Sequence, residues 1–379
     1  LGTPFPQDKP VEFITWLADQ LSIRLPTGRF NQFRHRYRTL EALLSDLERI
    51  YSDFGLEVIT SSGTSGRATI MVRDQQAIER TVDSFYQSFQ RYLEMQADHR
   101  AIFIMPPVTR IAMARMASFS VNRVGLAQDR IHYTIPYAAL PDQVRIRTGR
   151  TYRSGLNGFI ERRLLNPFMN WGFKNRVEPK TVQSTVDLLQ MAESAGEKVL
   201  LFGSWLQLHA VALAFKTRDR RCRLAPGSLI GSGGGMKELY PYSPADIRED
   251  LADAFVLADG APVTIRDVYG MAGANWAAMQ CAKGSYHIPP WVYPVTLDDD
   301  GGFQNTVDAS GLLAFFDPFG GGRLLPSFFK SADQLHLFNG GSGYASTQTC
   351  PCGESGAFIL NRSIQRVDLI DEAGCAAQV

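Results

Sequence analysis

Residues 58–72 read VITSSGTSGRATIMV, in which two β-branched, apolar runs flank a segment rich in Ser, Thr and Gly. A hydrophobic core has no use for such a polar segment. From residue 74 onward, apolar residues recur at alternating steps of four and three, which is the spacing of one helical face: Ile78, Val82, Phe85, Phe89 and Tyr92. The stretch therefore predicts a strand, a Ser/Gly loop and a helix, in that order.

A Ser/Gly loop between a strand and a helix presents backbone N–H groups and hydroxyls, which bind phosphate well. The Walker pattern of P-loop NTPases needs four residues between its glycines, followed by Lys and Ser or Thr. The segment GTSGR has two residues between its glycines and then Arg, so that class is disfavoured. The loop by itself fits either a phosphate-binding loop or an ordinary polar turn.

Composition narrows the classes of function. The chain has 379 residues, of which 45% are hydrophobic, and it balances 39 Lys and Arg against 38 Asp and Glu. This balance favours a small substrate or a protein partner over nucleic acid or an anionic membrane as the main partner. No apolar run approaches the roughly 20 residues of a membrane-spanning helix, and the N-terminus lacks the pattern of a secretory signal. We therefore expect no membrane span and a cytoplasmic protein.

The pattern of apolar and polar residues changes along the chain. Two amphipathic stretches predict a helical N-terminal layer over residues 1–50. Short apolar runs alternate with helical segments over residues 51–290, which predicts an α/β core with largely parallel strands. Short strands with Gly and Asp turns then predict a smaller β-rich subdomain over residues 291–360.

Three short motifs resemble those of the adenylate-forming enzymes, and they occur in the order of that family. SSGTSGR resembles the phosphate-binding loop, YGMAG at 269–273 the Tyr-Gly-x-Thr-Glu segment, and KSADQ at 330–334 the Thr-Gly-Asp segment. Within the superfamily, SGGGMK at 232–237 and the ending CPCG…QRVD…GC look most like two related groups. These are the acyl-protein synthetases of bacterial luminescence (LuxE-type) and the phenylacetate–CoA ligases.

The resemblance implies an α/β fold with mixed β-sheets sandwiched by helices, as in the large N-terminal domain of an adenylate-forming enzyme. It implies that residues 51–290 bind nucleotide and acyl group, and that residues 361–379 form a truncated hinge and tail, with the mobile C-terminal domain lacking. In such enzymes a carboxylic acid attacks the α-phosphate of ATP, giving an acyl-adenylate and pyrophosphate. A thiol then takes the acyl group.

The resemblance also assigns residues to ATP. The loop would hold the β- and γ-phosphates through hydroxyl, backbone and guanidinium contacts: Ser61, Ser62, Gly63, Thr64, Ser65, Gly66 and Arg67. Three glycines would flank the adenine: Gly233, Gly234 and Gly235. Tyr269 and Gly270 would lie near the adenine, Asp333 would bind the ribose hydroxyls, and Arg366 belongs to the same nucleotide-binding set. Lys237 is a candidate catalytic residue that would reach a phosphate or carboxylate, although a lone Lys in a Gly-rich turn is more often solvated.

One position departs from the family pattern. Gly273 stands where the family has the Glu that helps to hold the Mg²⁺ bridging the ATP oxygens. Mg²⁺ keeps several waters, so the loss of one carboxylate need not abolish its binding. The departure leaves open a second function, that of a degenerate homologue acting as an acyltransferase or as a non-catalytic acyl-binding subunit.

Four residues form two closely spaced pairs that suit a metal. Cys281 and His287 are six positions apart, and Cys350 and Cys352 are two apart in CPCG. Three thiolates and one imidazole are a ligand set for tetrahedral Zn²⁺, and related phenylacetate–CoA ligase-like enzymes show a similar arrangement. With four protein ligands the zinc would be structural. The alternative is a set of buried free thiols and a surface histidine.

The resemblance places an acyl thioester on a cysteine near the C-terminus. In the acyl-protein synthetases such a cysteine carries the acyl group, and the matching Gly-Cys assigns this role to Cys375. A thiolate is a suitable nucleophile for an acyl-adenylate, although the nearby Asp371 and Glu372 raise a thiol pKa. The implied partners are a fatty or aromatic carboxylic acid and an acyl acceptor, either coenzyme A or a reductase or acyl carrier protein. A terminal cysteine without a role is the alternative.

Overall fold

The computed structural model describes residues 6–61, 70–138, 140–147, 155–234, 240–271, 273–304, 306–318, 327–338 and 349–367. Its helices are α1 Pro10–Gln20, α2 Leu40–Ile50, α3 Gln75–Leu93, α4 Ala112–Val124, α5 Pro141–Arg147, α6 Gly155–Ile160, α7 Asn166–Gly172, α8 Glu178–Ala195, α9 Trp205–Lys216 and α10 Pro244–Ala254.

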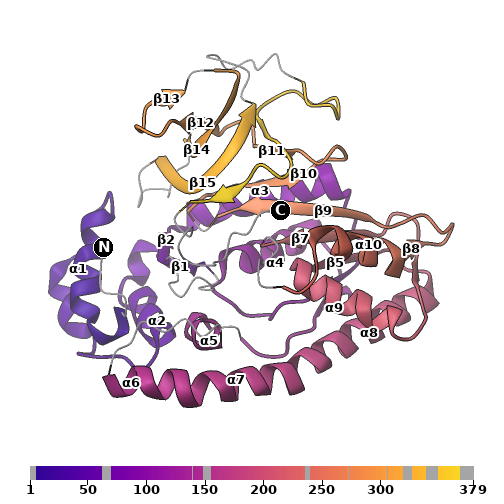
Figure 1. The fold of residues 1–379 in the computed structure, drawn as a ribbon. Helices are drawn as coiled ribbons and strands as arrows, with labels where there is room; N and C mark the ends of the chain where they lie inside the picture. The colour runs from indigo at the N-terminus through magenta and orange to yellow at the C-terminus, as the bar shows by residue number, and fades with distance from the viewer. Residues whose placement is uncertain are drawn as a thin grey trace.

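Most of the strands belong to one large mixed sheet (Figure 1), whose order is β13-β12-β14-β15-β16-β11-β10-β9-β7-β5-β3-β4, with β17 paired to β15. The strands are β1 Glu57–Thr60, β2 Ile70–Arg73, β3 Arg100–Phe103, β4 Ile131–Tyr133, β5 Val199–Gly203, β6 Cys222–Leu224, β7 Leu229–Gly233, β8 Phe255–Leu257, β9 Thr264–Gly270, β10 Ala277–Gln280, β11 Tyr286–His287, β12 Tyr293–Leu297, β13 Phe303–Gln304, β14 Asp308–Phe316, β15 Phe328–Phe338, β16 Phe358–Ile359 and β17 Gln365–Arg366.

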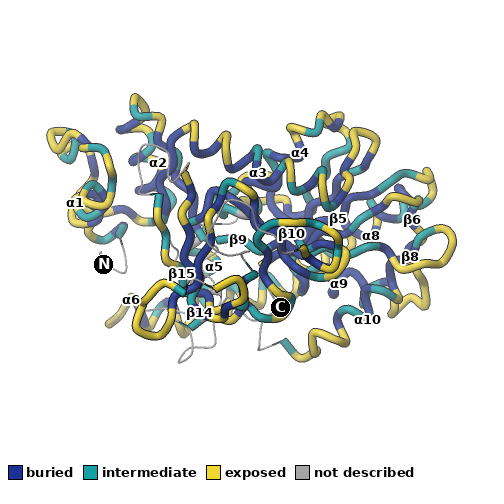
Figure 2. Tube along the Cα trace, turned by 90° about the horizontal axis from the view of Figure 1, so that it is seen from above, coloured by how far each residue is buried: buried dark blue, intermediate teal, exposed yellow. Residues whose placement is uncertain are grey.

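Strand direction changes at β9. The pairs β4–β3, β3–β5, β5–β7 and β7–β9 are parallel, whereas β9–β10 and the pairs beyond it are antiparallel. The parallel half is covered on both faces, because successive side chains of a strand point to opposite sides. Leu201 of β5 packs with α8, α9 and α10, and Phe202 packs with α3 and α4. Figure 2 shows the central strands as the most deeply buried part of the chain.

The N-terminal helices form a separate core with the hairpin β1–β2, through residues such as Leu44, Leu47 and Val58. The side chain of Thr39 accepts a hydrogen bond from the backbone of Ala42 and so caps the start of α2. Both helices lie within the two amphipathic stretches seen in the sequence. The predicted α/β fold with mixed sheets and flanking helices is confirmed.

The local order around the Ser/Gly loop differs from the prediction. The loop joins the two strands of the hairpin, with Thr60 paired to Ile70, and α3 begins only after β2. Residues 70–73 form a strand of their own because they pair with β1 and bury Met71 and Val72. The prediction that the loop leads straight into a helix was therefore wrong. The predicted helical face is correct, since Phe85 and Phe89 of α3 are buried.

The domain boundaries stay predictions, and residues 368–379 lie outside the described part. Among the residues that are described, none of the helices combines the length and the apolar character needed to cross a membrane.

A buried carboxylate lies in the middle of β9. Asp267 is almost completely buried and accepts hydrogen bonds from Trp205 Nε1 at 3.0 Å and from the Tyr286 hydroxyl at 2.7 Å. Burial raises the pKa of Asp267 to about 6, and the two hydrogen bonds only partly oppose this shift. The strand is thereby joined to α9 and to β11.

We expect Asp267 to make the stability of the fold depend on pH. The pKa of the folded state lies above that of the unfolded state, so the folded chain binds the proton more tightly. The contribution of Asp267 is therefore largest below about pH 4 and is lost as the pH rises to about 6. The Asp267→Asn variant should not show this fall in the free energy of unfolding, which is about 3 kcal/mol at most. Denaturant unfolding at several pH values measures it, with the exposed Asp299→Asn as control. A stability difference from wild type that is constant across this range contradicts the expectation.

Candidate nucleotide-binding site and metal centre

The structure brings together two of the residues assigned to the nucleotide. The Tyr269 hydroxyl, at the end of β9, donates a hydrogen bond to Asp333 Oδ2 of β15 at 2.8 Å. Asp333 is buried and lies opposite Arg366 of β17 in the antiparallel register, although nothing is described of the Arg366 side chain. Residues from three strands, distant in sequence, therefore meet at one place.

The glycine segment reaches the same edge of the sheet. Gly233 ends β7 and pairs in parallel with Val268, the neighbour of Tyr269, while Gly270 ends β9. Gly234 follows with φ +86°, a backbone conformation that favours glycine. In open α/β sheets, ligands bind outside the carboxyl ends of the parallel strands, which is where these glycines lie. Gly235 and Lys237 lie outside the described residues.

The Ser/Gly loop begins at Ser61, directly after β1. Its other assigned residues lie outside the described part of the chain: Ser62, Gly63, Thr64, Ser65, Gly66 and Arg67. The strand that leaves the loop runs toward the YGMAG segment, because Arg73 at the end of β2 donates a hydrogen bond to the backbone carbonyl of Ala274 at 3.4 Å. The Thr81 hydroxyl of α3 contacts Asn275 Oδ1 at 3.4 Å.

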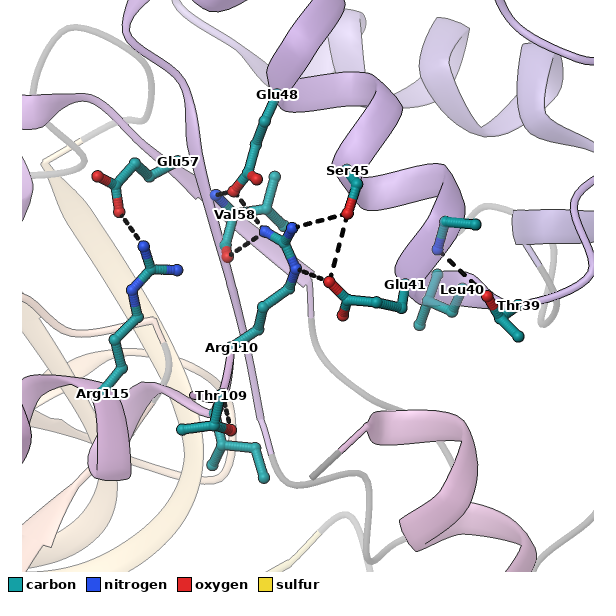
Figure 3. A network of polar contacts seen from close by, with 12 residues as sticks. Thr39, Leu40, Glu41, Ser45, Glu48, Glu57, Val58, Thr109, Arg110 and Arg115 are labelled. Atoms are coloured by element: carbon teal, nitrogen blue, oxygen red, sulfur yellow. Dashed lines mark hydrogen bonds and ion pairs between the residues drawn. The ribbon is translucent and has the colours of Figure 1, made fainter. Parts of the chain in front are cut away.

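An arginine that sequence reasoning missed fixes the strand entering this loop (Figure 3). Arg110 Nε donates to Glu41 at 2.6 Å, and its Nη1 donates to Glu48 and to the Val58 carbonyl. Glu48 in turn accepts from the backbone N–H of Val58 at 2.7 Å. The two carboxylates raise the pKa of Arg110 although burial opposes this shift. The network ties α2 and β1 to the segment before α4.

The backbone of Arg110 adds a second tie. Its carbonyl accepts a hydrogen bond from Thr60, the last residue of β1, at 2.7 Å. The side chain and the backbone of one residue therefore fix β1 up to the position where the loop begins. No local pattern in the sequence marks Arg110, because all of its partners are more than 50 residues away or lie on another element.

Position 273 is filled by a neighbouring aromatic ring. A Cβ atom placed on Gly273 would lie 2.5 Å from Cε1 of Phe329, closer than real Cβ atoms approach. Phe329 is held there by stacking on Phe315, with ring centroids 5.8 Å apart. The space next to Gly273 is therefore occupied. The structure leaves no room there for the Glu of the family pattern unless Phe329 moves.

A buried carboxylate, that of Asp317, lies close to the YGMAG segment. Asp317 accepts a hydrogen bond from Asn275 Nδ2 at 3.4 Å and faces the guanidinium of Arg73. Burial lowers the pKa of Arg73 to about 10, and the carboxylates of Asp317 and Asp74 oppose this shift. The negative charge of Asp317 is thus balanced by a buried cation.

The four predicted metal ligands converge. The ligand atoms of Cys281, His287, Cys350 and Cys352 all lie within 4.8 Å of one another. The two sulfurs of Cys281 and Cys350 are 4.0 Å apart, and Cys352 Sγ lies 3.3 Å from His287 Nε2. A tetrahedral site with Zn–S bonds of about 2.3 Å spaces two sulfurs about 3.8 Å apart, so these distances suit zinc.

Two tight turns and a carboxylate support this cluster. Gly284 and Gly353, with φ +89° and +94°, close the turns that carry Cys281 and the Cys350–Cys352 pair. Glu354 Oε2 lies 3.8 Å from His287 Nδ1, the ring nitrogen that faces away from the sulfurs. Metal-binding histidines commonly have a carboxylate beside this nitrogen, although 3.8 Å is longer than a hydrogen bond. Burial lowers the pKa of His287, which favours the neutral ring that binds metals.

Helix α3 reaches the cluster at its C-terminal end. Arg91 Nε and the Tyr92 hydroxyl each donate a hydrogen bond to Glu354 at 2.8 Å. Burial raises the pKa of Glu354, and the bonds from Arg91 and Tyr92 outweigh it and lower the pKa overall. Tyr92 also stacks on His287, with ring centroids 5.7 Å apart.

Of the two cysteines outside the cluster, the structure describes Cys222. Cys222 is fully buried on β6, and burial raises the pKa of its thiol to about 12, so it is a poor nucleophile. Cys375 lies outside the described residues.

With this geometry in hand, comparisons with known proteins place the fold. No protein-family model matches the chain, and no curated protein does. Among solved structures, the chain is similar to 2-hydroxyisobutyryl-CoA ligase in the postadenylation state, with 11% identity and a TM-score of 0.50 over 96% of this chain and 65% of that one. This likeness shows the fold. The acyl-protein synthetase branch stays a prediction.

The chain is also similar to two further solved structures. The open conformation of the same ligase, in complex with 2-HIB-AMP and CoA, has 11% identity and a TM-score of 0.47 over 93% of this chain and 69% of that one. A long-chain-fatty-acid-CoA ligase from Archaeoglobus fulgidus has 10% identity and a TM-score of 0.46 over 82% and 50%. The chain spans 47% to 69% of the length of the solved structures it matches.

We expect Gly273→Glu to destabilise the protein rather than to restore the family pattern. The new side chain must displace Phe329 from its stack on Phe315, and overpacking of this kind costs about 1 to 3 kcal/mol. Denaturant unfolding of Gly273→Glu, Phe329→Ala and the double variant measures it, and we expect the double variant to be more stable than the sum of the single effects. Gly28→Glu, at a position with open space, is the control. Wild-type stability of Gly273→Glu contradicts the packing described here.

Proposed function

We propose that this protein uses ATP to activate a carboxylic acid as an acyl-adenylate and passes the acyl group to a thiol. The observation that carries the proposal is the meeting of Tyr269, Asp333 and Gly233 at the carboxyl edge of β7 and β9. These are residues assigned to the nucleotide from three separate motifs. The acyl-CoA ligase fold supports the same reaction.

The chemistry needs two displacements. A carboxylate oxygen of the substrate forms a bond to the α-phosphorus of ATP while the bond from that phosphorus to the pyrophosphate breaks. A thiolate then attacks the acyl carbonyl, and AMP leaves. The N–H groups and Arg67 of the Ser/Gly loop would stabilise the charge that builds up on pyrophosphate.

The arrangement of the described residues suits nucleotide binding. Asp333 would accept hydrogen bonds from the ribose hydroxyls, and its bond from Tyr269 fixes its orientation. Arg110 would keep the start of the Ser/Gly loop in place by holding β1. Mg²⁺ would neutralise phosphate charge and keep mostly water ligands, because Gly273 supplies no carboxylate and Asp317 faces Arg73.

A second function is favoured by one observation. Phe329 fills the space beside Gly273, which suggests a site adapted to the absence of the glutamate. A protein that binds or transfers a preformed acyl group without ATP would tolerate this change.

Exchange of labelled pyrophosphate into ATP, with a panel of fatty and aromatic acids, separates the two functions. We expect exchange with at least one acid in the wild type. We expect weaker ATP binding in the Thr64→Ala, Arg67→Ala double variant, by about 1.5 to 3 kcal/mol for each hydrogen bond lost to a charged phosphate. Arg220→Ala, whose side chain pairs with Glu193 on the surface, is the matched control. Unchanged ATP affinity in the double variant refutes the loop assignment. Acyl binding without exchange favours the second function.

We also propose that the Cys281, His287, Cys350 and Cys352 cluster binds one structural Zn²⁺. The four ligand atoms leave no position for a substrate, so the ion would serve to join the strand pair β10–β11 to the turn at 350–353. The contacts of Glu354 would extend this link to α3. Binding energy at such a site contributes directly to folding.

Metal analysis of the purified protein tests this proposal. We expect one zinc per chain, and we expect Cys350→Ala to lose the metal and to unfold at lower temperature. Cys222→Ala removes another buried thiol and should keep the metal. Wild-type protein without zinc, or Cys350→Ala with a full complement of zinc, would overturn the assignment.

The acyl acceptor is part of the same proposal. Cys375, coenzyme A, or the pantetheine of a carrier protein remain the candidate thiols. The burial of Cys222 argues against it as an acceptor.

A further inference from the structure

Residues 155–177 form an exposed helix that no function described above uses. Helical backbone runs without interruption from α6 through π-helical turns at Glu161–Leu165 and Phe173–Val177 into α8. Only the later part, in α8, contributes to the main core, through residues such as Val186 and Leu189. The segment before it lies along the lower edge of the molecule in Figure 1.

Six of the exposed side chains of this segment are large and apolar, and five of these six lie at helical spacing. Leu156 is 75% exposed, Phe168 is 70% exposed and Trp171 is 52% exposed, and Phe159 and Leu164 are exposed as well. These five follow one another at steps of three, five, four and three. The step of five crosses the first π-helical turn, where hydrogen bonds run from i to i+5, so the five share one face.

The opposite face is attached to the protein. Asn166 Nδ2 donates a hydrogen bond to the carbonyl of Ile146 in α5 at 2.6 Å, and α5 packs against α7. Gly158 and Glu161 are the buried residues of the segment. The apolar face is therefore held outward by contacts on the other side, and the helix forms a ridge rather than a groove.

The exposed charges of the segment are all positive. Arg162, Arg163, Lys174 and Arg176 are all exposed, whereas the one acidic residue, Glu161, is 6% exposed. Within the described part of the chain none of these four cations forms an ion pair, and the Arg176 guanidinium lies over the Trp171 ring, 5.2 Å from its centroid. The chain as a whole is nearly neutral, with 39 Lys and Arg against 38 Asp and Glu, so the positive excess of this segment is not a property of the whole chain.

We propose that this helix docks on an anionic lipid surface. A cationic helix with Leu, Phe and Trp on one face has the composition of helices that lie in a membrane interface. Charge complementarity favours an anionic lipid surface over a second copy of this chain, because a second copy would bring two sets of four cations together. A ridge also fits a deformable surface better than it fits a rigid pocket.

Vesicle co-sedimentation with the full chain tests the proposal. We expect binding to phosphatidylcholine vesicles that contain phosphatidylglycerol, little binding to phosphatidylcholine alone, and weaker binding at high salt. The variant with Arg162, Arg163, Lys174 and Arg176 changed to Gln should lose about fivefold in affinity for each charge removed. Phe168→Ser with Trp171→Ser should lose at least tenfold. Phe303→Ser with Leu360→Ser, at exposed apolar positions elsewhere, is the matched control and should bind as wild type does.

A second measurement needs no variant. Hydrogen exchange of the wild-type protein should slow in peptides covering 155–177 when anionic vesicles are added, and should not change with neutral vesicles. Absence of binding to anionic vesicles, binding that is equal in all variants, or slowed exchange elsewhere only would overturn the proposal. Self-association that is lost in the Phe168→Ser, Trp171→Ser variant would overturn it in favour of a second copy.

Discussion

The placement of strand β9 between β7 and β10 is the constraint on which the rest of the structure depends. Its parallel pairing with β7 ends the α/β half of the sheet, and its antiparallel pairing with β10 begins the β-rich half. Because side chains alternate along a strand, Asp267 and Tyr269 share one face while Val268 enters the core with α3 and α4. One strand thus joins the two halves and carries a residue of the candidate site.

Helix α3 connects the two centres that flank this strand. It follows β2, which ends at Arg73 beside the YGMAG segment and opposite Asp317. The last turn of α3 holds Glu354 behind His287. The candidate metal centre and the candidate nucleotide site are therefore joined by one rigid element. A structural ion at one end of α3 would help to fix the position of the other end, and with it the hairpin that carries the Ser/Gly loop.

Sequence reasoning succeeded where the signal was local. The periodicity of α3 and the Cys-Pro-Cys-Gly turn each lie within one short stretch of the chain, so neighbouring residues suffice to recognise them. It failed after the Ser/Gly loop, because whether residues 70–73 form a strand depends on their pairing with β1. It also missed the cationic helix at 155–177, because the nearly equal totals of 39 and 38 charges average over the chain and conceal a local excess.

The sequence by itself determined the α/β class, the periodicity of α3 and the identity of the four candidate metal ligands. Only the tertiary structure decided what surrounds them: Phe329 in the space beside Gly273, Asp317 against Arg73, and Arg110 on β1. The physical reason is the distance along the chain over which each kind of interaction acts. Helical and strand periodicity arise from the backbone geometry of adjacent residues, whereas burial, charge pairing and steric exclusion arise between residues that only the packed fold brings into contact.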